Sequence, residues 1–193
     1  MPELTENSVA FKEWACVVRA LATGEQILIL RKGGIHEKGK KFDVAHESFF
    51  LFPTYEHQNP EDLSPRGRAL LQETLSAYSR MKKNDLPIET FANVEENFWI
   101  DRLEKLLLLS PFHVWSELAV RKRFEWGKEK GLYVMVCRVF KLPQANLLKN
   151  NPAYGGCRSW VDLDTPIARA GIRPVLTDPD FQEKFASLRR LLA

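Results

Sequence analysis

Cysteine is scarce in this chain, where only positions 16, 137 and 157 of 193 residues carry a thiol. No two of these cysteines form a Cys-x-x-Cys pair. An odd number of scattered cysteines argues against a disulfide framework and is typical of free thiols in a reducing compartment. We therefore expect a cytoplasmic protein.

Long apolar runs are also missing. No stretch approaches the ~18 residues that a membrane-spanning helix needs, and residues 1–6 are acidic where a signal peptide would be basic and then apolar. The sequence has no low-complexity tract and no internal repeat. With 45% hydrophobic and 11% aromatic residues, we expect one globular domain at residues 9–193, a flexible lead-in at residues 1–8, and no membrane partner.

Neither sign of charge dominates, because 28 basic residues face 25 acidic ones and the net charge is only +3. So small a margin neither demands nor excludes a polyanionic partner. The positions of the cations along the chain therefore matter more than their number.

Hydrophobic spacing and turn signals divide the chain into elements. Helices are predicted at residues 9–22, 65–82, 101–109, 116–124 and about 179–192, with a strand as the alternative for the first because Cys16-Val17-Val18 favours β-structure. Strands are predicted at residues 26–30, 49–52, 88–98, 132–140 and 159–163. We expect residues 26–30 and 132–140 to be central in the sheet and residues 88–98 to form an edge. Loops are expected at residues 32–47, 141–152 and 164–177, the last with a short helix as an alternative.

Helices and strands alternate without a regular βαβ period, which predicts an α+β fold: one domain with a mixed, mostly antiparallel sheet packed by helices. The runs 26–30, 49–52 and 132–140 are apolar on both faces and are expected to share one sheet. The helix at residues 65–82 is expected to pack on that sheet through Leu71, Leu75 and Tyr78.

Five short segments are distinctive in combination. They are Lys12-Glu13-Trp14, Arg31-Lys32-Gly33-Gly34-Ile35, Phe50-Leu51-Phe52-Pro53-Thr54-Tyr55-Glu56-His57-Gln58, Pro111-Phe112-His113-Val114-Trp115 and Gly156-Cys157-Arg158-Ser159-Trp160. On these motifs the chain resembles an uncharacterised bacterial family, described as domain of unknown function 1802, over about residues 10–163. Members joined to restriction-endonuclease-like domains of the Mrr type imply a restriction-modification, genome-defence or other DNA-linked role, with a restriction-endonuclease-like protein as a partner. The resemblance assigns no catalytic residue.

A built-in nuclease is not expected. The common metal-dependent restriction core needs an acid at one strand end and then an acid, one residue and a lysine on the next strand, so that the two carboxylates hold Mg²⁺. No segment of this chain follows that order. The histidines and cysteines also lack the close spacing of metal ligands, so neither a metal nor a cofactor is predicted.

Cations interleaved with aromatic residues are the main functional signal, because cations bind phosphates and exposed aromatic rings stack on bases. They are Arg31, Lys32, Lys38, Lys40, Lys41, Tyr55, Trp115, Arg121, Arg123, Trp126, Tyr154, Arg158 and Trp160. The competing interpretation puts Trp14, Trp115 and Trp160 in the core and residues 121–123 on a solvated helix face paired with Glu117 and Glu125. Recognition of DNA or RNA is nevertheless the leading hypothesis.

Glycines and a proline stand beside polar residues at three strand ends, which favours a ligand site there. We expect those ends to form one concave, positively charged face that binds nucleic acid through Arg31, Lys32, Tyr55, His57, Gln58, Tyr154 and Arg158. The segment Arg31-Lys32-Gly33-Gly34 is at best a weak anion site, because it lacks the Gly-Lys-Ser/Thr ending of a nucleotide loop.

Two other classes of function stay open. An enzyme acting on a small molecule or nucleotide would use His57 and Glu56 as an acid-base pair, or Cys157 as a nucleophile. A subunit that binds a protein partner would instead present an apolar patch.

Overall fold

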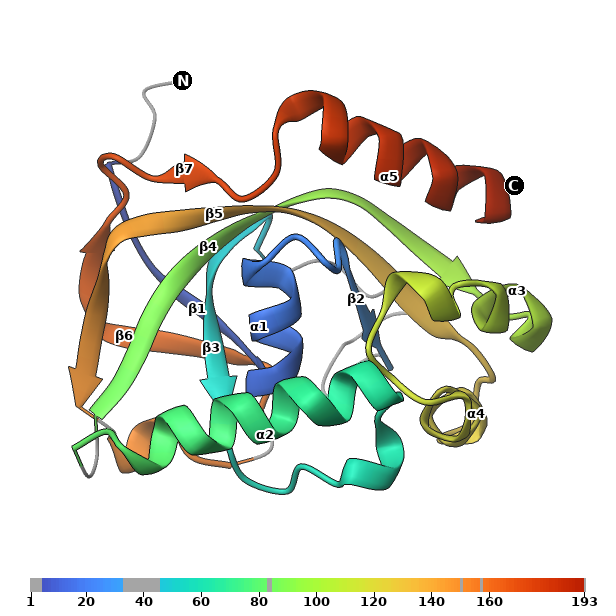
Figure 1. The fold of residues 1–193 in the computed structure, drawn as a ribbon, viewed down its shortest axis with the longest axis horizontal. Coiled ribbons are helices and arrows are strands. Elements are labelled where there is room, and N and C mark those ends of the chain that lie inside the picture. Colours follow the sequence, from blue (N-terminus) through green and yellow to red (C-terminus); the bar gives the residue numbers. More distant parts are fainter. Residues whose placement is uncertain (1–4, 33–45, 83–84, 150, 157, 193) are drawn as a thin grey trace.

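The computed structural model of the protein describes residues 5–32, 46–82, 85–149, 151–156 and 158–192 (Figure 1). These residues form a single α+β domain with a seven-stranded mixed sheet, as the sequence predicts. The strands are β1 (Glu6–Trp14), β2 (Leu28–Arg31), β3 (Ser48–Thr54), β4 (Asp85–Ile100), β5 (Leu132–Lys149), β6 (Trp160–Ala168) and β7 (Arg173–Pro174). The α-helices are α1 (Ala15–Ala22), α2 (Pro65–Ser79), α3 (Leu103–Leu108), α4 (Glu117–Glu125) and α5 (Asp178–Leu192).

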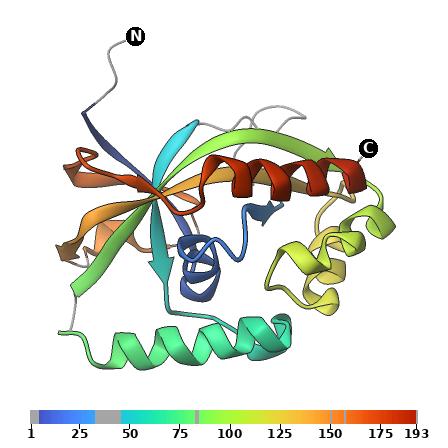
Figure 2. The same ribbon diagram turned by 45° about the horizontal axis from the view of Figure 1, so that its top comes forward.

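The strand order is β2-β5-β4-β3-β1-β6, and β7 pairs with β5. The pair β1–β3 is parallel, whereas the other pairs are antiparallel. The apolar runs at residues 26–30, 49–52 and 132–140 therefore contribute to one sheet, which confirms that prediction. Figures 1 and 2 show α5 along the β4–β5 pair, on the side away from α2.

Strand β3 is a continuous apolar run because both of its faces are buried. Phe49 and Leu51 point into one core, while Phe50 and Phe52 point into a second core on the opposite face. Successive side chains of a strand alternate between faces, so a strand that is covered on both sides has no polar position.

Two helix starts follow the capping rules. The Ser64 hydroxyl accepts a hydrogen bond from the Gly67 N–H, with Pro65 at the first helical position of α2. The Ser116 hydroxyl accepts one from the Ala119 N–H at the start of α4. In both places a side-chain oxygen satisfies an N–H that the helix itself cannot pair.

The predicted helix at residues 9–22 is wrong in its first half, because residues 6–14 form β1 and only Ala15–Ala22 is helical. Strand β1 lies between β3 and β6, with Phe11 in one core and Ala10 in the other. Burial on both faces gave an apolar spacing that resembles a helix. Residues 16–18, which suggested a strand, lie in α1, and β1 begins inside the segment predicted as the lead-in.

The sheet positions of two strands differ from the prediction. Strand β2 lies at the end of the strand order, and its apolar run is explained by burial of residues 28–30 in one core with side chains of α1 and α4 rather than by a central place. The predicted edge strand at residues 88–98 belongs to β4, which lies between β3 and β5. Register shifts at Ile88/Thr90 and Val94/Glu96 break its alternation, as bulges do, and this hid an interior strand.

Two of the predicted loops, residues 141–152 and 164–177, contain regular structure. Residues 141–149 continue β5, residues 164–168 continue β6, and Arg173–Pro174 forms β7. The ends of β5 and β6 contain Asn, Asp and Pro, which have low β-propensity, so the sequence there does not predict a strand. Pairing with β4 and β1 stabilises the strands instead. The loop predicted at residues 32–47 lies largely outside the described residues.

Helix α2 packs on α1 rather than flat on the sheet, as Figure 2 shows. Its buried residues are Gly67, Leu70 and Leu71, whereas Leu75 is 40% exposed and Tyr78 is 37% exposed. The prediction of Leu71 as a packing residue is therefore confirmed, while the one for Leu75 and Tyr78 is wrong. The second half of α2 diverges from the core.

None of the described helices has the length and apolar character needed to cross a membrane.

Candidate functional site

The end of β1 is the point where several motif segments meet. The Arg31 guanidinium donates a hydrogen bond of 2.5 Å from Nη2 to the Lys12 carbonyl oxygen. The Thr54 hydroxyl donates to the Glu13 carbonyl oxygen at 3.2 Å, and the Lys12 N–H donates to the Ser159 carbonyl oxygen at 2.8 Å. The ends of β2 and β3 and the residue before β6 are thus joined to β1.

Arg31 reaches this point over an aromatic ring. Its guanidinium lies 4.3 Å from the centre of the Phe11 ring. Its Nε atom is buried and has no hydrogen-bond partner among the described residues. A guanidinium offers five donors in a rigid fork, and here only one of them has a described acceptor.

A second guanidinium, that of Arg123 on α4, lies nearby. It stacks on the Trp115 ring at 3.4 Å from the ring centre. Burial lowers the pKa of Arg123 to about 10. The charge of Glu13 raises this pKa, whereas the charge of Arg31 lowers it further. Arg123 therefore keeps its charge at neutral pH and lies within electrostatic reach of both Arg31 and Glu13.

Glu13 is the acidic member of this group and is only 4% exposed. Its Oε1 atom accepts a hydrogen bond of 2.8 Å from the Trp14 N–H, while Oε2 is buried without a partner among the described residues. Within the described part of the chain, no ion pair joins Arg31 or Arg123 to any carboxylate. We call Glu13, Arg31 and Arg123 the two-arginine site.

Several other polar atoms around this site are buried and unpaired. The Nδ1 atom of His113 accepts a hydrogen bond of 3.2 Å from the Trp115 N–H, so that the proton of the neutral ring is on Nε2, which has no described partner. Burial lowers the pKa of His113 to about 4, so the ring is neutral at pH 7. The indole N–H of Trp115 is likewise unpaired within the described ranges. The side-chain amide of Gln58, whose binding role stays a prediction, is unpaired as well but is not counted in this site. Because buried polar groups are normally satisfied, such a concentration of them favours a binding site for a polar ligand.

Lys32 is held by the protein itself. Its amine donates to the carbonyl oxygens of Phe124, Glu129 and Gly131 at 2.9, 2.6 and 3.0 Å. Burial lowers the pKa of Lys32, with Glu125 and Glu129 opposing it. The lysine thus hydrogen-bonds to carbonyl oxygens at and after the C-terminal end of α4. The sequence did not suggest this structural role.

The two predicted tyrosines lie in different places. Tyr55 is partly buried and stacks on Tyr78 with ring centres 3.9 Å apart, and burial raises its pKa to about 12. Tyr154 is buried in the second core beside Phe52. Its hydroxyl donates to the Asp164 carboxylate at 2.9 Å and accepts from the Asp164 N–H at 3.1 Å.

The remaining predicted residues are at the surface or outside the described ranges. Glu56, His57 and Arg158 are exposed, and His57 has a left-handed backbone, with φ of 57°. Glu56 and His57 make no hydrogen bond or ion pair with other described residues. Cys157, Gly33, Gly34, Lys38, Lys40 and Lys41 lie outside the described residues. The roles assigned to all of these residues stay predictions.

The structure thus brings Arg31 into one group with Arg123, which is among the predicted interleaved cations, and with Glu13, which was not predicted as a site residue. Glu13 was missed because it was placed on a helix, although it stands in the motif Lys12-Glu13-Trp14. Arg123 was one of the interleaved cations, and the competing interpretation placed it on a solvated face together with Arg121. That assignment fits Arg121, whose guanidinium bonds to Glu117 at 2.8 Å, but not Arg123, which is partly buried and stacks on Trp115.

The thiols and potential metal ligands offer little chemistry in the described part of the chain. Cys16 and Cys137 are buried and free, and burial raises the pKa of both, that of Cys16 to about 12. No group of three or more His, Cys, Asp or Glu side chains in the described ranges is placed to hold a metal ion.

Comparison with solved structures found the ASCH protein from Zymomonas mobilis, with 12% identity and a TM-score of 0.46 over 92% of this chain and 93% of that one. Two single-substitution variants of that protein match with TM-scores of 0.45 and 12% and 13% identity, over 93% of this chain and 96% and 94% of theirs. A likeness at this level supports no inference about activity. A search of curated proteins found no match to this chain.

A family model described as Domain of unknown function (DUF1802) matches residues 10–187. The match covers the two-arginine site, all five motif segments and most of α5, so it extends beyond the limit near residue 163 that the motifs suggested. The chain therefore belongs to the DUF1802 family.

Proposed function

We propose that this protein recognises nucleic acid, with DNA as the preferred form, and that a backbone phosphate binds between Arg31 and Arg123. The observation that carries the proposal is the two-arginine site: two cationic side chains near each other, both partly buried, and neither in an ion pair with a described carboxylate. Like charges that are brought together out of water are costly, and a bound phosphate would offset that cost.

The surroundings of the site suit a nucleotide. Trp14 is partly exposed and its ring lies 4.7 Å from that of Trp115. Trp126 follows α4 and is 56% exposed. Exposed aromatic rings beside guanidinium groups are the surface on which unpaired bases stack.

Glu13 would help to select the ligand. Its unpaired Oε2 atom repels a second phosphate and accepts a hydrogen bond from a base or sugar donor. A site of two cations and one carboxylate thus favours one phosphate with an attached donor over a bare polyanion.

The biological setting is a finer part of the same proposal. The restriction-modification or genome-defence role, the restriction-endonuclease-like partner and the cytoplasmic location follow from the family resemblance and the free thiols. The proposal includes no nuclease activity of this chain, because the acid-and-lysine order of the common restriction core is missing from the sequence.

The test is fluorescence anisotropy with labelled single-stranded DNA, duplex DNA and RNA of one sequence, measured over a range of salt concentrations. Arg31→Gln and Arg123→Gln should each weaken binding by about tenfold and lower the slope of log K against log salt by about 1, since one phosphate contact is lost. Arg190→Gln on α5 is the matched control, because Arg190 is exposed and its one bond to a described residue is to Ser187 in its own helix.

The outcomes are decisive in both directions. Loss of affinity in the two site variants, with Arg190→Gln unchanged and all three folded by circular dichroism, supports the proposal. Equal affinity in all four proteins, or no binding to any of the three probes at low salt, would overturn it. Tighter binding of RNA than of DNA would keep the site and reject the preference for DNA.

A further inference from the structure

A cavity of about 260 Å³ lies between α1, α2 and the sheet. Its walls combine apolar side chains with a few polar ones. The apolar part is contributed by Ala15, Val18, Ala22, Leu51, Pro53, Ala77, Met81 and Pro87. The polar and aromatic part consists of Arg19, Tyr55, Glu73, Thr74, Glu89 and Thr90. A mostly apolar hollow with a few polar groups is the usual form of a small-molecule site, and this volume lies just below that of drug-sized ligands.

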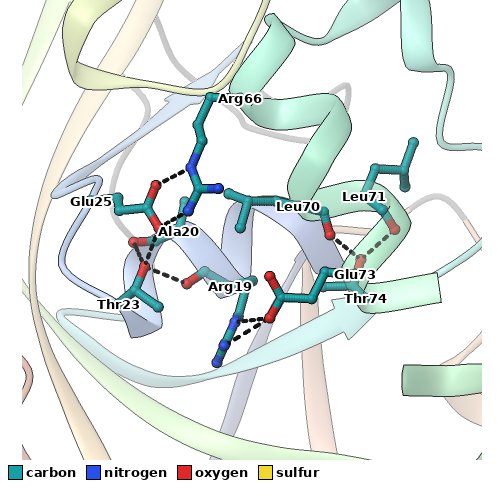
Figure 3. A network of polar contacts seen from close by, with 9 residues as sticks. All are labelled: Arg19, Ala20, Thr23, Glu25, Arg66, Leu70, Leu71, Glu73 and Thr74. Atoms are coloured by element: carbon teal, nitrogen blue, oxygen red, sulfur yellow. Dashed lines mark hydrogen bonds and ion pairs between the residues drawn. The ribbon is translucent and has the colours of Figure 1, made fainter. Parts of the chain in front are cut away.

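The cavity exists because only the first half of α2 packs closely against the core. Its first half buries Gly67, Leu70 and Leu71. The Thr74 hydroxyl bonds to the carbonyl oxygens of Leu70 and Leu71 at 2.9 and 3.0 Å and is thereby satisfied within the helix (Figure 3). Beyond Thr74 the helix covers the cavity without filling it.

The charges around the cavity do not balance. Arg19 on α1 and Glu73 on α2 face each other across its side and form an ion pair of 2.8 Å, so they neutralise each other (Figure 3). Glu89 on β4 makes no ion pair or hydrogen bond with any other described residue. The cavity therefore presents one uncompensated carboxylate, although the chain as a whole is basic.

Two further groups lie beside that carboxylate. Glu89 is close enough to Tyr55 to raise the pKa of its phenol, after the larger effect of burial. The hydroxyl oxygen of Thr90, the next residue on β4, is fully buried with no partner in the described ranges. The wall thus contains a carboxylate, an electron-rich ring and an unpaired hydroxyl, and the remaining surface is apolar.

We propose that this cavity binds a small organic cation, an amine or alkylated ammonium with an apolar body. The ammonium lies between the Glu89 carboxylate and the ring of Tyr55, because a cation is attracted by both. The apolar body fills the space between Leu51, Val18 and Ala77, from which water is expelled. The cavity lining shares no residue with the two-arginine site, and this inference does not rest on the proposed nucleic-acid binding.

Isothermal titration calorimetry with 2-phenylethylamine tests this inference, and 2-phenylethanol serves as the neutral probe of matched shape. The amine should bind more tightly than the alcohol. Glu89→Gln should weaken the amine by about tenfold and leave the alcohol unchanged, since a tenfold loss corresponds to one exposed or partly buried charge contact. Ala77→Phe, at an exposed helix position, should fill the cavity and abolish binding of both probes.

Glu183→Gln on α5 is the control for the loss of an exposed carboxylate, and Arg31→Gln is the control for the nucleic-acid site; both should bind the amine like the unmodified protein. Thermal unfolding should show that every variant is folded. The inference is overturned if the amine binds no more tightly than the alcohol, if neither probe binds at millimolar concentration, or if Glu89→Gln or Ala77→Phe leaves the amine affinity unchanged.

Discussion

The amine of Lys32, at the end of β2, donates a hydrogen bond of 2.9 Å to the carbonyl oxygen of Phe124, which is 92 residues later in the chain and near the end of α4. Two more carbonyl oxygens, those of Glu129 and Gly131, share the same amine. Lys32 thus joins the edge strand to the helix that carries Arg123.

Lys32→Met should destabilise the protein, although an exposed cation usually contributes little to folding. Three carbonyl oxygens lose their charged donor, which should lower the free energy of unfolding by about 2 kcal/mol. Urea titration followed by circular dichroism measures this change. Lys128→Met, at an exposed position in the segment after α4, should change stability by less than about 0.5 kcal/mol. Equal effects of the two substitutions would refute the structural role of Lys32.

Gly67→Ala should also destabilise the protein, which is the opposite of the usual effect in a helix. In an exposed helix interior, alanine is favoured over glycine by about 1 kcal/mol. Here a Cβ atom would lie 2.4 Å from the backbone oxygen of Val114 and 3.1 Å from Leu63 Cβ. We expect a loss of about 2 kcal/mol as α2 is pushed from its place.

Ala69→Gly on the exposed face of the same helix gives the comparison, with an expected loss of about 1 kcal/mol from propensity alone. Differential scanning calorimetry of both variants decides the point. A higher melting temperature for Gly67→Ala would show that α2 does not pack closely against residue 114.

Stability should fall between pH 6.5 and about pH 4 because of His113. Burial lowers the pKa of this ring to about 4 in the folded protein, whereas the unfolded chain takes up the proton near pH 6.5. Below pH 6.5 the unfolded state therefore binds more protons, and the stabilisation present at neutral pH is lost as the pH falls through this window, by up to about 3 kcal/mol.

Urea midpoints at pH 7, 6, 5 and 4 test this prediction. His113→Asn keeps an acceptor for the Trp115 N–H and removes the titration, so its stability should depend less on pH over the same range. An unchanged pH profile in that variant would show that other groups control the acid sensitivity.

Local signals in the sequence predicted the parts of the fold that depend on neighbouring residues. The serine caps of α2 and α4 and the apolar run of β3 each follow from a few adjacent side chains. The prediction was wrong at β1 and at the second half of β5, where pairing with distant strands decides the structure. Neither Phe11 nor Asn146 has a strand partner near it in sequence, so no window of ten or so residues contains the cause.

The candidate site shows the same limit at the level of side chains. Arg31 was predicted because it stands beside glycines at a strand end. Arg123 stood among the interleaved cations, but it was not distinguished from Arg121 on the same helix, because the sequence does not show which of the two packs inward. Stacking on Trp115 decides this, and that contact exists only after α4 has packed beside the residues before it.

Strand β1 pairs in parallel with β3, some 40 residues later, and in antiparallel with β6, where Phe11 faces Trp160. During synthesis, β1 would leave the ribosome long before its second neighbour exists, with one edge open to other chains. The two-arginine site then forms only when the last strands arrive, because Lys12, whose carbonyl oxygen accepts the hydrogen bond from Arg31, is held by β3 on one side and by Ser159 on the other. Contacts of such sequence separation are also slow to form, so phosphate binding during refolding should appear late, together with the final recovery of the native circular dichroism spectrum.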